Sequence, residues 1–137
     1  MRIFLTGATG FVGSHLLNIL TDMPDVYVKA LARSPQSTTK VPISKPPKWL
    51  FKSYSEITPE DFSDIDVFVH LAAHSANVPY DNLQNCLYWN LTQPLEIFHK
   101  AFDSGVKKFF IAGTCFEYGL SGLRYQLIPP DAPLEPT

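Results

Sequence analysis

Three glycines near the start of the chain, Gly7, Gly10 and Gly13, are spaced so that bare backbone can approach an anion. They follow an apolar run at residues 3–5 and precede an apolar periodicity of three to four residues that begins at Phe11. Strand, glycine turn and helix in direct succession can cradle a pyrophosphate. The first glycine permits the tight turn, the second lets backbone come close to phosphate, and the third lets the helix pack on the strand. The N–H groups of the first helical turn then point at the anion, aided by the helix dipole. The alternative is an ordinary strand–turn–helix connection with incidental glycines.

Apolar runs that suit buried strands recur along the chain between helical or irregular stretches. These runs lie at residues 3–5, 26–32, 49–51, 67–71 and 108–112. Thr58 and Pro59 predict the N-cap and first position of a brief helix before the fourth run. The residues from 33 to 48 and from 120 to 137 are predicted to be irregular. Strands that alternate with helices or crossovers predict an α/β fold with a doubly wound parallel sheet, in one domain over residues 1–137.

The longest helix is predicted from about residue 80 to residue 104, where Gly105 ends it. Pro94 has no N–H, so the carbonyl of Asn90 loses its helical partner and the helix should kink there. We hypothesise that this freed carbonyl holds a water in a proton relay, unless it faces apolar core. One apolar stripe is interpreted as core or as a subunit interface, and it consists of Leu83, Leu87, Leu91, Leu95, Phe98 and Phe102.

The composition narrows the classes of function. A net charge of −2 gives no basic field that would attract nucleic acid. No stretch reaches the ~18 apolar residues of a membrane span, and polar residues interrupt residues 1–20 too often for a signal peptide. Cys86 and Cys115 follow no metal or redox spacing, and free, buried thiols suit a reducing compartment. The sequence therefore predicts a cytoplasmic protein.

Three later segments and the glycine turn together resemble one family. The run His70-Leu71-Ala72-Ala73 is similar to that family's H-x-A-A/G motif, and Asn90 matches its asparagine in the following helix. The residues from 109 to 119 end in Thr-x-x-x-Tyr-Gly, similar to the family's strand before its catalytic Ser or Thr. With the G-x-x-G-x-x-G spacing, these motifs resemble the extended short-chain dehydrogenase/reductases, the sugar-nucleotide epimerases and dehydratases, over most of the chain.

The resemblance implies a nicotinamide cofactor held at the glycine turn and after three of the strands. The residues it assigns to the cofactor are Gly7, Thr9, Gly10, Phe11, Val12, Gly13, Arg33, Ser34, Leu71, Ala72, Ala73, Asn90 and Ala112. It also implies that Thr114 hydrogen-bonds the reacting oxygen as a catalytic residue, although the residues alone favour a simple cap. His70 and His74 are interpreted as satisfied polar groups, because neither has a partner at a metal-site spacing, and no metal site is predicted.

The end of the second strand favours NADP, with NAD as the runner-up. An acid that accepts the ribose hydroxyls is expected there, but the chain reads Ala-Leu-Ala-Arg-Ser. Arg33 and Ser34 can instead hold a 2′-phosphate through charge-assisted hydrogen bonds. The alternative is that Arg33 stacks on adenine and does not discriminate. Ser53 or Ser55 would have to replace the family's acid near adenine, which is also absent.

The chain contains no Tyr-x-x-x-Lys, the family's catalytic pair. Residues 130–137 resemble the segment just before that motif, so we expect the first part of a longer enzyme, inactive alone. The fifth strand should then be a sheet edge prone to self-association. The resemblance further implies a nucleotide-sugar substrate for the full-length protein, an epimerase, dehydratase or ketoreductase reaction, and a homodimer through the helix at 80–104. Two alternatives stay open: a non-catalytic, redox-sensing nucleotide module, and a chain that binds nothing.

Overall fold

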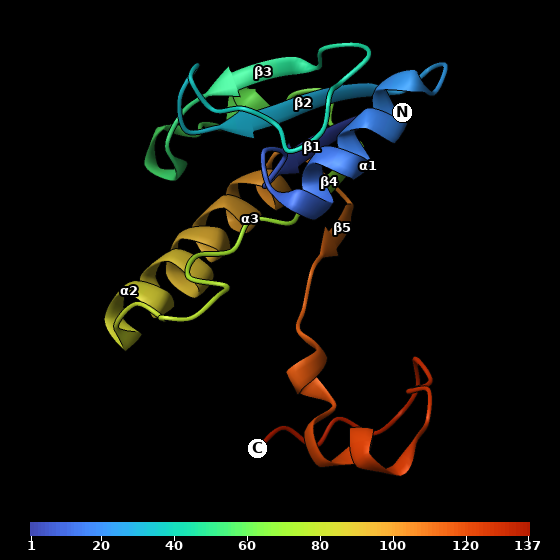
Figure 1. Ribbon diagram of the computed structural model, residues 1–137. Helices are drawn as coiled ribbons and strands as arrows, with labels where there is room; N and C mark the ends of the chain where they lie inside the picture. The colour runs from blue at the N-terminus through green and yellow to red at the C-terminus, as the bar shows by residue number, and fades with distance from the viewer.

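The computed structural model describes residues 1–137 and shows a five-stranded sheet in which every neighbouring pair is parallel. The strand order is β3-β2-β1-β4-β5, and Figure 1 shows its twist. The strands are β1 (Arg2–Thr6), β2 (Tyr27–Ala32), β3 (Lys48–Phe51), β4 (Val67–His70) and β5 (Lys108–Ile111). The expected strands are confirmed to within two residues, and the parallel α/β sheet is confirmed with them.

One face of the sheet is covered by helix α1 (Phe11–Asp22), which begins directly after the glycine turn. Alternate residues of β1, such as Ile3 and Leu5, pack there against Leu17 and Leu20 of the helix. Because side chains alternate across a strand, Phe4 points to the opposite face. The central strands β1, β2 and β4 are therefore buried on both sides, and they are apolar runs for that reason.

The connection from β2 to β3 is an irregular segment that lies along α1 instead of forming a helix of its own. Three side chains of α1 hold this segment. They are spaced four residues apart and therefore lie on one face of the helix. Ser14 accepts a hydrogen bond from the backbone of Lys40 (2.9 Å), and Asn18 and Asp22 bond Ser44. The expected irregular stretch is confirmed, and polar contacts fix its path.

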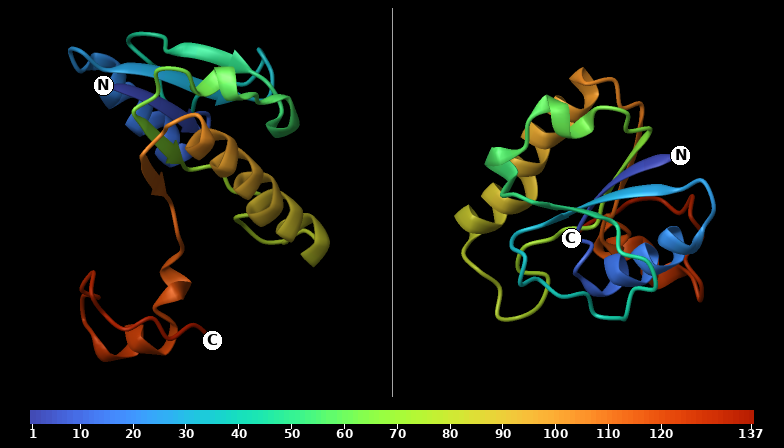
Figure 2. Two further views of the ribbon diagram at one scale, coloured as in Figure 1. Left: turned by 180° about the vertical axis from the view of Figure 1, so that it is seen from behind. Right: turned by 90° about the horizontal axis from the view of Figure 1, so that it is seen from above.

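The opposite face of the sheet is covered by two 3₁₀ helices and a longer helix, as the view from above in Figure 2 shows. The 3₁₀ helices are η1 (Tyr54–Glu56) and η2 (Pro59–Phe62), and the longer helix is α3 (Gln93–Asp103). Thr58 caps η2 and Pro59 opens it, as expected. Phe62, Phe68 and Ile97 are fully buried between these elements and the strands.

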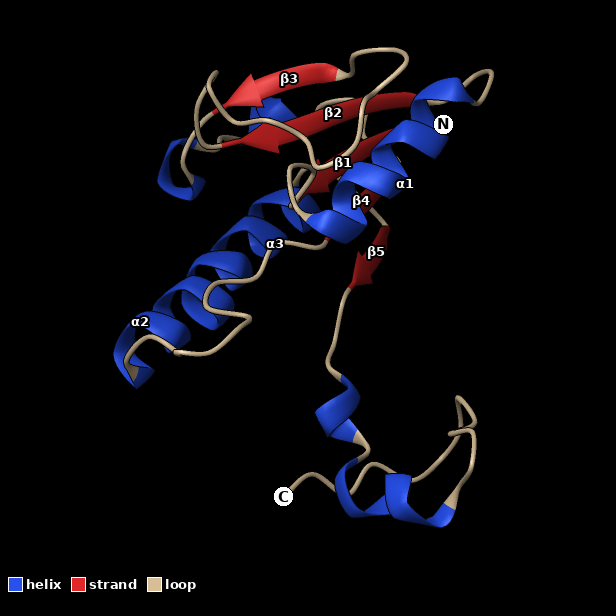
Figure 3. Cartoon of the chain, in the orientation of Figure 1, coloured by secondary structure: helices blue, strands red, loops and turns tan.

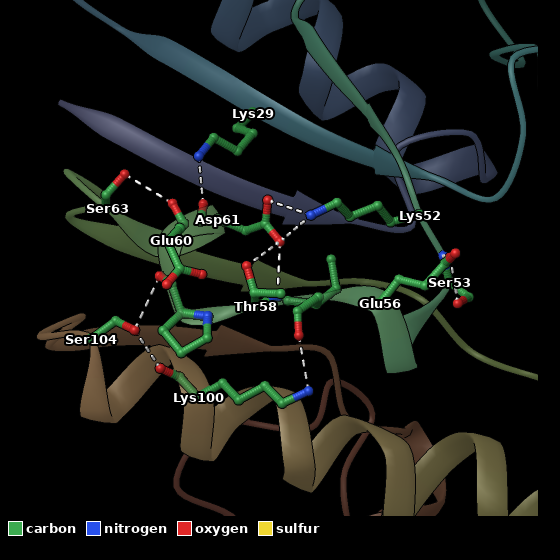
Figure 4. A network of polar contacts seen from close by, with 12 residues as sticks. Lys29, Lys52, Ser53, Glu56, Thr58, Glu60, Asp61, Ser63, Lys100 and Ser104 are labelled. Atoms are coloured by element: carbon green, nitrogen blue, oxygen red, sulfur yellow. Dashed lines mark hydrogen bonds and ion pairs between the residues drawn. The ribbon is translucent and has the colours of Figure 1, made fainter.

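Lysines fix η2 to the sheet and to α3 (Figure 4). The Lys52 ammonium contacts the Asp61 carboxylate at 2.7 Å, and Lys29 donates to the Asp61 carbonyl. Burial works to raise the pKa of Asp61, but bonds from Lys52 and Thr58 outweigh it, so the pKa lies below its usual value. Lys100 of α3 reaches the Ile57 carbonyl at 2.9 Å. The segment between β3 and β4 is thus held by charge-assisted bonds as well as by packing.

The long helix differs from expectation in its start and its regularity. Residues 80–82 are not helical, because Asn82 is the N-cap that accepts a bond from the Asn85 N–H. Helix α2 (Leu83–Leu87) passes into a π-helical turn, η3 (Tyr88–Thr92), and then into α3 (Figure 3). A π turn lies where the kink was expected at Asn90, next to Pro94, and there the N–H of Gln93 bonds the Tyr88 carbonyl. The kink and the water held by the Asn90 carbonyl stay predictions.

The apolar stripe of this helix is largely not core. The core-facing residues of α3 are Gln93, Pro94, Ile97 and Ala101. Within the expected stripe, only Phe98 packs partly into the core. The others are exposed, from 46% for Leu95 to 72% for Leu83. The interpretation as core is wrong for them, and the interface interpretation stays a prediction.

After β5 the chain leaves the sheet and forms a separate, mostly irregular segment (Figures 1 and 2). It contains the short 3₁₀ helices η4 (Cys115–Glu117) and η5 (Gly119–Arg124). Strand β5 ends the strand order, which confirms the expected edge, and its Phe110 is 63% exposed. Both cysteines are free, but Cys115 is exposed and Cys86 only partly buried, so the expectation of buried thiols is wrong. None of the helices has the length and apolar character that a membrane crossing requires.

Candidate functional site

The glycine turn is in direct contact with the chain that follows β4. Gly7 has a φ of 75°, which L side chains rarely adopt. A Cβ on Gly7 would also lie 2.5 Å from the Leu71 carbonyl carbon and 2.6 Å from the Ala72 nitrogen. Only glycine fits at position 7. The glycine turn and the residues that follow β4 are therefore in direct contact, as their motifs predicted.

Gly13 lets helix α1 sit directly on the turn. A Cβ on Gly13 would lie 2.0 Å from the Gly7 carbonyl oxygen, which confirms close packing as the role of the third glycine. Gly10 is less constrained, since its Cβ would meet only that same oxygen, at 3.2 Å. It caps α1 without a side-chain hydrogen bond, and no acidic residue lies in the first turn. The first N–H groups of the helix, at the exposed residues Phe11 and Val12, therefore have no capping side chain.

The glycine turn lies at the point where the order of the strands in the sheet reverses. Strands β2 and β3 lie on one side of β1, and β4 and β5 lie on the other. In an open parallel sheet the crevice beyond the carboxyl ends of the strands, at such a switch point, is where ligands bind. Leu71 continues the ladder to the Thr6 carbonyl at 3.2 Å, and Ala112 continues it to the His70 carbonyl at 3.0 Å. The ends of β1, β4 and β5 thus form one continuous edge.

Two polar side chains are buried beneath the turn. Thr6 and His70 are paired residues of β1 and β4, and the Thr6 Oγ1 lies 2.7 Å from the His70 Nδ1. Burial lowers the pKa of His70 to about 4, so the imidazole is neutral at ordinary pH. The Tyr54 ring lies 6.4 Å from the His70 ring, centroid to centroid, and burial raises the pKa of the Tyr54 phenol. The interpretation of His70 as a satisfied polar group is confirmed.

The residues after β2 stand at the same edge of the sheet. Arg33 is exposed and Ser34 is half-buried. Ser34 opens a turn in which its carbonyl accepts from the Ser37 N–H and its hydroxyl from the Gln36 N–H. No side-chain acid occupies the end of β2, because Ala32 is followed directly by Arg33.

The loop after β4 is held by the helix that follows it. The Asn90 side chain accepts from the His74 N–H at 2.7 Å and donates to the His74 carbonyl at 3.0 Å. The His74 Nε2 lies 2.8 Å from an Asp81 oxygen, and this hydrogen bond lowers the pKa of Asp81. His74 is therefore also a satisfied polar group. Asn90 lies in the π turn, and its side chain contacts the backbone of the loop after β4.

Nearly the whole chain matches a known protein family. Residues 3–136 match the family described as NAD dependent epimerase/dehydratase family. The chain belongs to this family. The resemblance noted from the motifs is thereby confirmed, and so is the Rossmann-type sheet.

Solved members and fold relatives span the whole of the chain but are longer. An NAD-dependent NDP-hexosamine 5,6-dehydratase, TunA, is 31% identical with a TM-score of 0.75; 98% of this chain covers 43% of it. The UDP-N-acetylglucosamine 4-epimerase of Methanobrevibacter ruminantium has the same fold, at 20% identity and a TM-score of 0.77, with 98% and 44% covered. A short match to an aldehyde reductase of Aspergillus flavus is 57% identical over 37 residues, 26% of this chain and 4% of that protein. The chain thus spans less than half of the solved relatives.

Within the epimerase/dehydratase fold, the predicted residues lie in several places. The glycine turn at residues 7–13 contacts Leu71 and Ala72, which Ala73 follows, at the switch point. Ala112 lies at the end of the neighbouring strand β5, and Arg33 and Ser34 follow β2. Thr114 and Asn90 are engaged elsewhere. Thr114 caps η4, its hydroxyl accepting from the Phe116 N–H at 3.3 Å and its own N–H donating to Glu117 at 2.7 Å. The catalytic assignment of Thr114 and the cofactor assignments stay predictions.

Sequence reasoning missed the side chains that support the site. Thr6, Tyr54 and the pair formed by His74 and Asp81 belong to no motif that was singled out. The only signal for Thr6 was its place, the last strand residue before the first glycine. Nothing in the sequence pairs Tyr54 with Thr6, because they lie 48 positions apart and meet only when η1 folds over the sheet.

Proposed function

We propose that residues 1–137 are the dinucleotide-binding part of an NAD(P)-dependent sugar-nucleotide epimerase, dehydratase or ketoreductase. The observation that carries this proposal is the turn at Gly7 and Gly13, which leaves no room for any Cβ and presents uncapped N–H groups. Such groups bind the pyrophosphate of a dinucleotide through hydrogen bonds and the helix dipole. The family match over 3–136 supports the same conclusion.

The reaction we propose for the full-length protein is hydride transfer at a sugar carbon. Within this chain the backbone of the turn would hold the cofactor, and Thr114 would hydrogen-bond the reacting oxygen once its segment is placed against substrate. The solved relative TunA is named as an NDP-hexosamine dehydratase, which supports a nucleotide-sugar substrate. Because the chain contains no Tyr-x-x-x-Lys to act as general acid/base, we expect binding without turnover by residues 1–137 alone. The exposed free thiol of Cys115 supports the cytoplasm as its location.

NADPH is expected to bind more tightly than NADH, because Arg33 is exposed beside an acid-free strand end. Titration of each reduced cofactor by its fluorescence gives both dissociation constants. Arg33→Ala should weaken NADPH binding about tenfold, the loss of one charge-assisted contact, and leave NADH binding nearly unchanged. Lys40→Ala, a nearby lysine whose ordered contact is through its backbone, is the matched control. Equal affinities for the two cofactors, or tighter binding of NADH, would reject the preference for NADP, and a protein that binds neither cofactor would reject the proposed function.

We also propose a homodimer through the exposed stripe on α2, η3 and α3. Leu91 is 51% exposed at its centre, so Leu91→Glu should not disturb the core but should place a charge in the interface. Sedimentation velocity is expected to show a dimer for the wild type and a monomer for Leu91→Glu. Ile19→Glu, at a position on α1 that is 61% exposed, is the control and should stay dimeric. A dimer that survives Leu91→Glu would move the interface elsewhere, with the edge of β5 as the other exposed apolar candidate.

The alternative function is a nucleotide-binding or redox-sensing module without catalysis. Such a module keeps the glycine turn and dispenses with Tyr-x-x-x-Lys, whereas the Thr-x-x-x-Tyr-Gly segment after β5 favours the enzyme. The coding sequence downstream of residue 137 separates the two. An in-frame Tyr-x-x-x-Lys supports the enzyme, and an immediate stop supports the module.

A further inference from the structure

The buried group formed by Tyr54, Thr6 and His70 serves neither the core nor any motif of the site. Thr6 is fully buried and His70 is 6% exposed, and both lie on the face of the sheet that α3 covers. The ring centroids of Tyr54 and His70 are 6.4 Å apart, and the Phe98 ring stands perpendicular to the imidazole at 5.1 Å. Polar groups are costly in such surroundings unless each is hydrogen-bonded. A polar group in this place therefore calls for an explanation.

The position of the pair is its distinctive feature. Thr6 is the last residue before Gly7, and His70 is the last before Leu71. The backbones of Gly7 and Leu71 are in close contact, because a Cβ added to Gly7 would lie only 2.5 Å from the Leu71 carbonyl carbon. The 2.7 Å contact between Thr6 and His70 is thus a side-chain tie across β1 and β4 at the point where the crevice opens. Two parallel strands have no other side-chain hydrogen bond here to fix their separation.

The bond between the two side chains can run in either direction. Either the Thr6 hydroxyl donates to an Nδ1 without a proton, or an Nδ1–H donates to the Thr6 Oγ1. In both cases the Thr6 hydroxyl holds His70 in a single tautomer.

We propose that Thr6 and His70 form a positioning unit that fixes the width of the crevice at the glycine turn, through the hydrogen bond that joins β1 to β4. The part that concerns a nucleotide rests on the proposed function. A binding site loses affinity when its geometry relaxes by about 0.5 Å, and the unit prevents that relaxation where β1 and β4 end. The two residues contact no cofactor themselves and act through the backbone of Gly7 and Leu71.

Thr6→Val tests the unit, because valine keeps the shape of threonine and removes its hydroxyl. Thr6→Ser restores the hydroxyl, and Thr21→Val removes a hydroxyl that bonds only helix backbone, 3.0 Å from the Leu17 carbonyl. Nitrogen NMR of the imidazole gives the His70 tautomer without nucleotide, and amide spectra report on Gly7 and Leu71. The dissociation constant of the reduced cofactor is then measured for each variant.

The wild type and Thr6→Ser are expected to show one tautomer, the same in both, and Thr6→Val a mixture of tautomers with shifted Gly7 and Leu71 amides. Thr6→Val should bind cofactor about tenfold more weakly, and Thr6→Ser and Thr21→Val should match the wild type. Wild-type affinity in Thr6→Val, or unshifted Gly7 and Leu71 amides in that variant, would overturn the inference and leave the proposed function standing. If the wild type binds no dinucleotide but Thr6→Val shifts the Gly7 and Leu71 amides, the proposed function fails and the positioning unit stands.

Discussion

Gly13→Ala is expected to abolish measurable dinucleotide binding and to lower the stability of the fold. The new Cβ would lie 2.0 Å from the Gly7 carbonyl oxygen and 2.7 Å from the Gly7 carbonyl carbon. These are backbone atoms, so helix α1 must move away from the turn to make room. Overpacking of this kind costs about 1–3 kcal/mol. The displaced helix also takes its uncapped N–H groups away from the anion, so we expect more than about a hundredfold loss of affinity.

The measurement is a cofactor titration together with a thermal melt of the same sample. Gly122→Ala is the control, because its Cβ would meet only the Cδ1 of Ile128, at 3.2 Å, the movable end of a side chain far from the turn. It should match the wild type in both measurements. If Gly13→Ala bound cofactor as well as the wild type, the helix N-terminus would not be the pyrophosphate site.

The second large effect expected is a loss of stability in mild acid that depends on one histidine. Burial lowers the pKa of His70 to about 4 in the folded state, from 6.5 in the unfolded chain. The unfolded chain therefore binds a proton first, and stability that is complete above pH 6.5 is lost as the pH falls towards 4. The full shift corresponds to about 3 kcal/mol in the free energy of unfolding.

Urea unfolding at several pH values between 7 and 4 measures this loss. His70→Asn is the matched variant, since its side-chain amide can hydrogen-bond Thr6 as Nδ1 does but does not titrate. The variant should be less stable at neutral pH, because it leaves a cavity, but its stability should fall far less across this range. The same pH dependence in both proteins would assign the effect to other groups and would show that His70 is not buried as a neutral base.

The sequence predicted most of the fold because its signals are local. Apolar runs and the glycine turn locate β1, α1 and β4, and the cap at Thr58 locates η2. The error was in the helix after β4, where regular leucine spacing indicated a buried stripe. Burial depends on which face meets the sheet, and Pro94 with the π turn sets that face, so Ile97 and Ala101 are buried in place of Leu95 and Phe102.

The site was predictable where backbone makes it and unpredictable where side chains from distant segments support it. Gly7 and Gly13 are recognisable because only glycine satisfies both the dihedral angle and the contact distance. The tie from Thr6 to His70 spans 64 positions and depends on the register between β1 and β4. Register is a property of the folded sheet, and no spacing in the chain encodes it.

The irregular connection between β2 and β3 leaves this protein room to vary. A crossover helix there would need a length and a hydrophobic face matched to the sheet, whereas the present segment is anchored by hydrogen bonds to Ser14, Asn18 and Asp22. Insertions and deletions between those anchor points can be absorbed without altering the pitch of α1 or the turn before it. Natural variation in chain length should therefore concentrate in this connection, which begins at Arg33 after the end of β2, while the glycine turn is inherited unchanged.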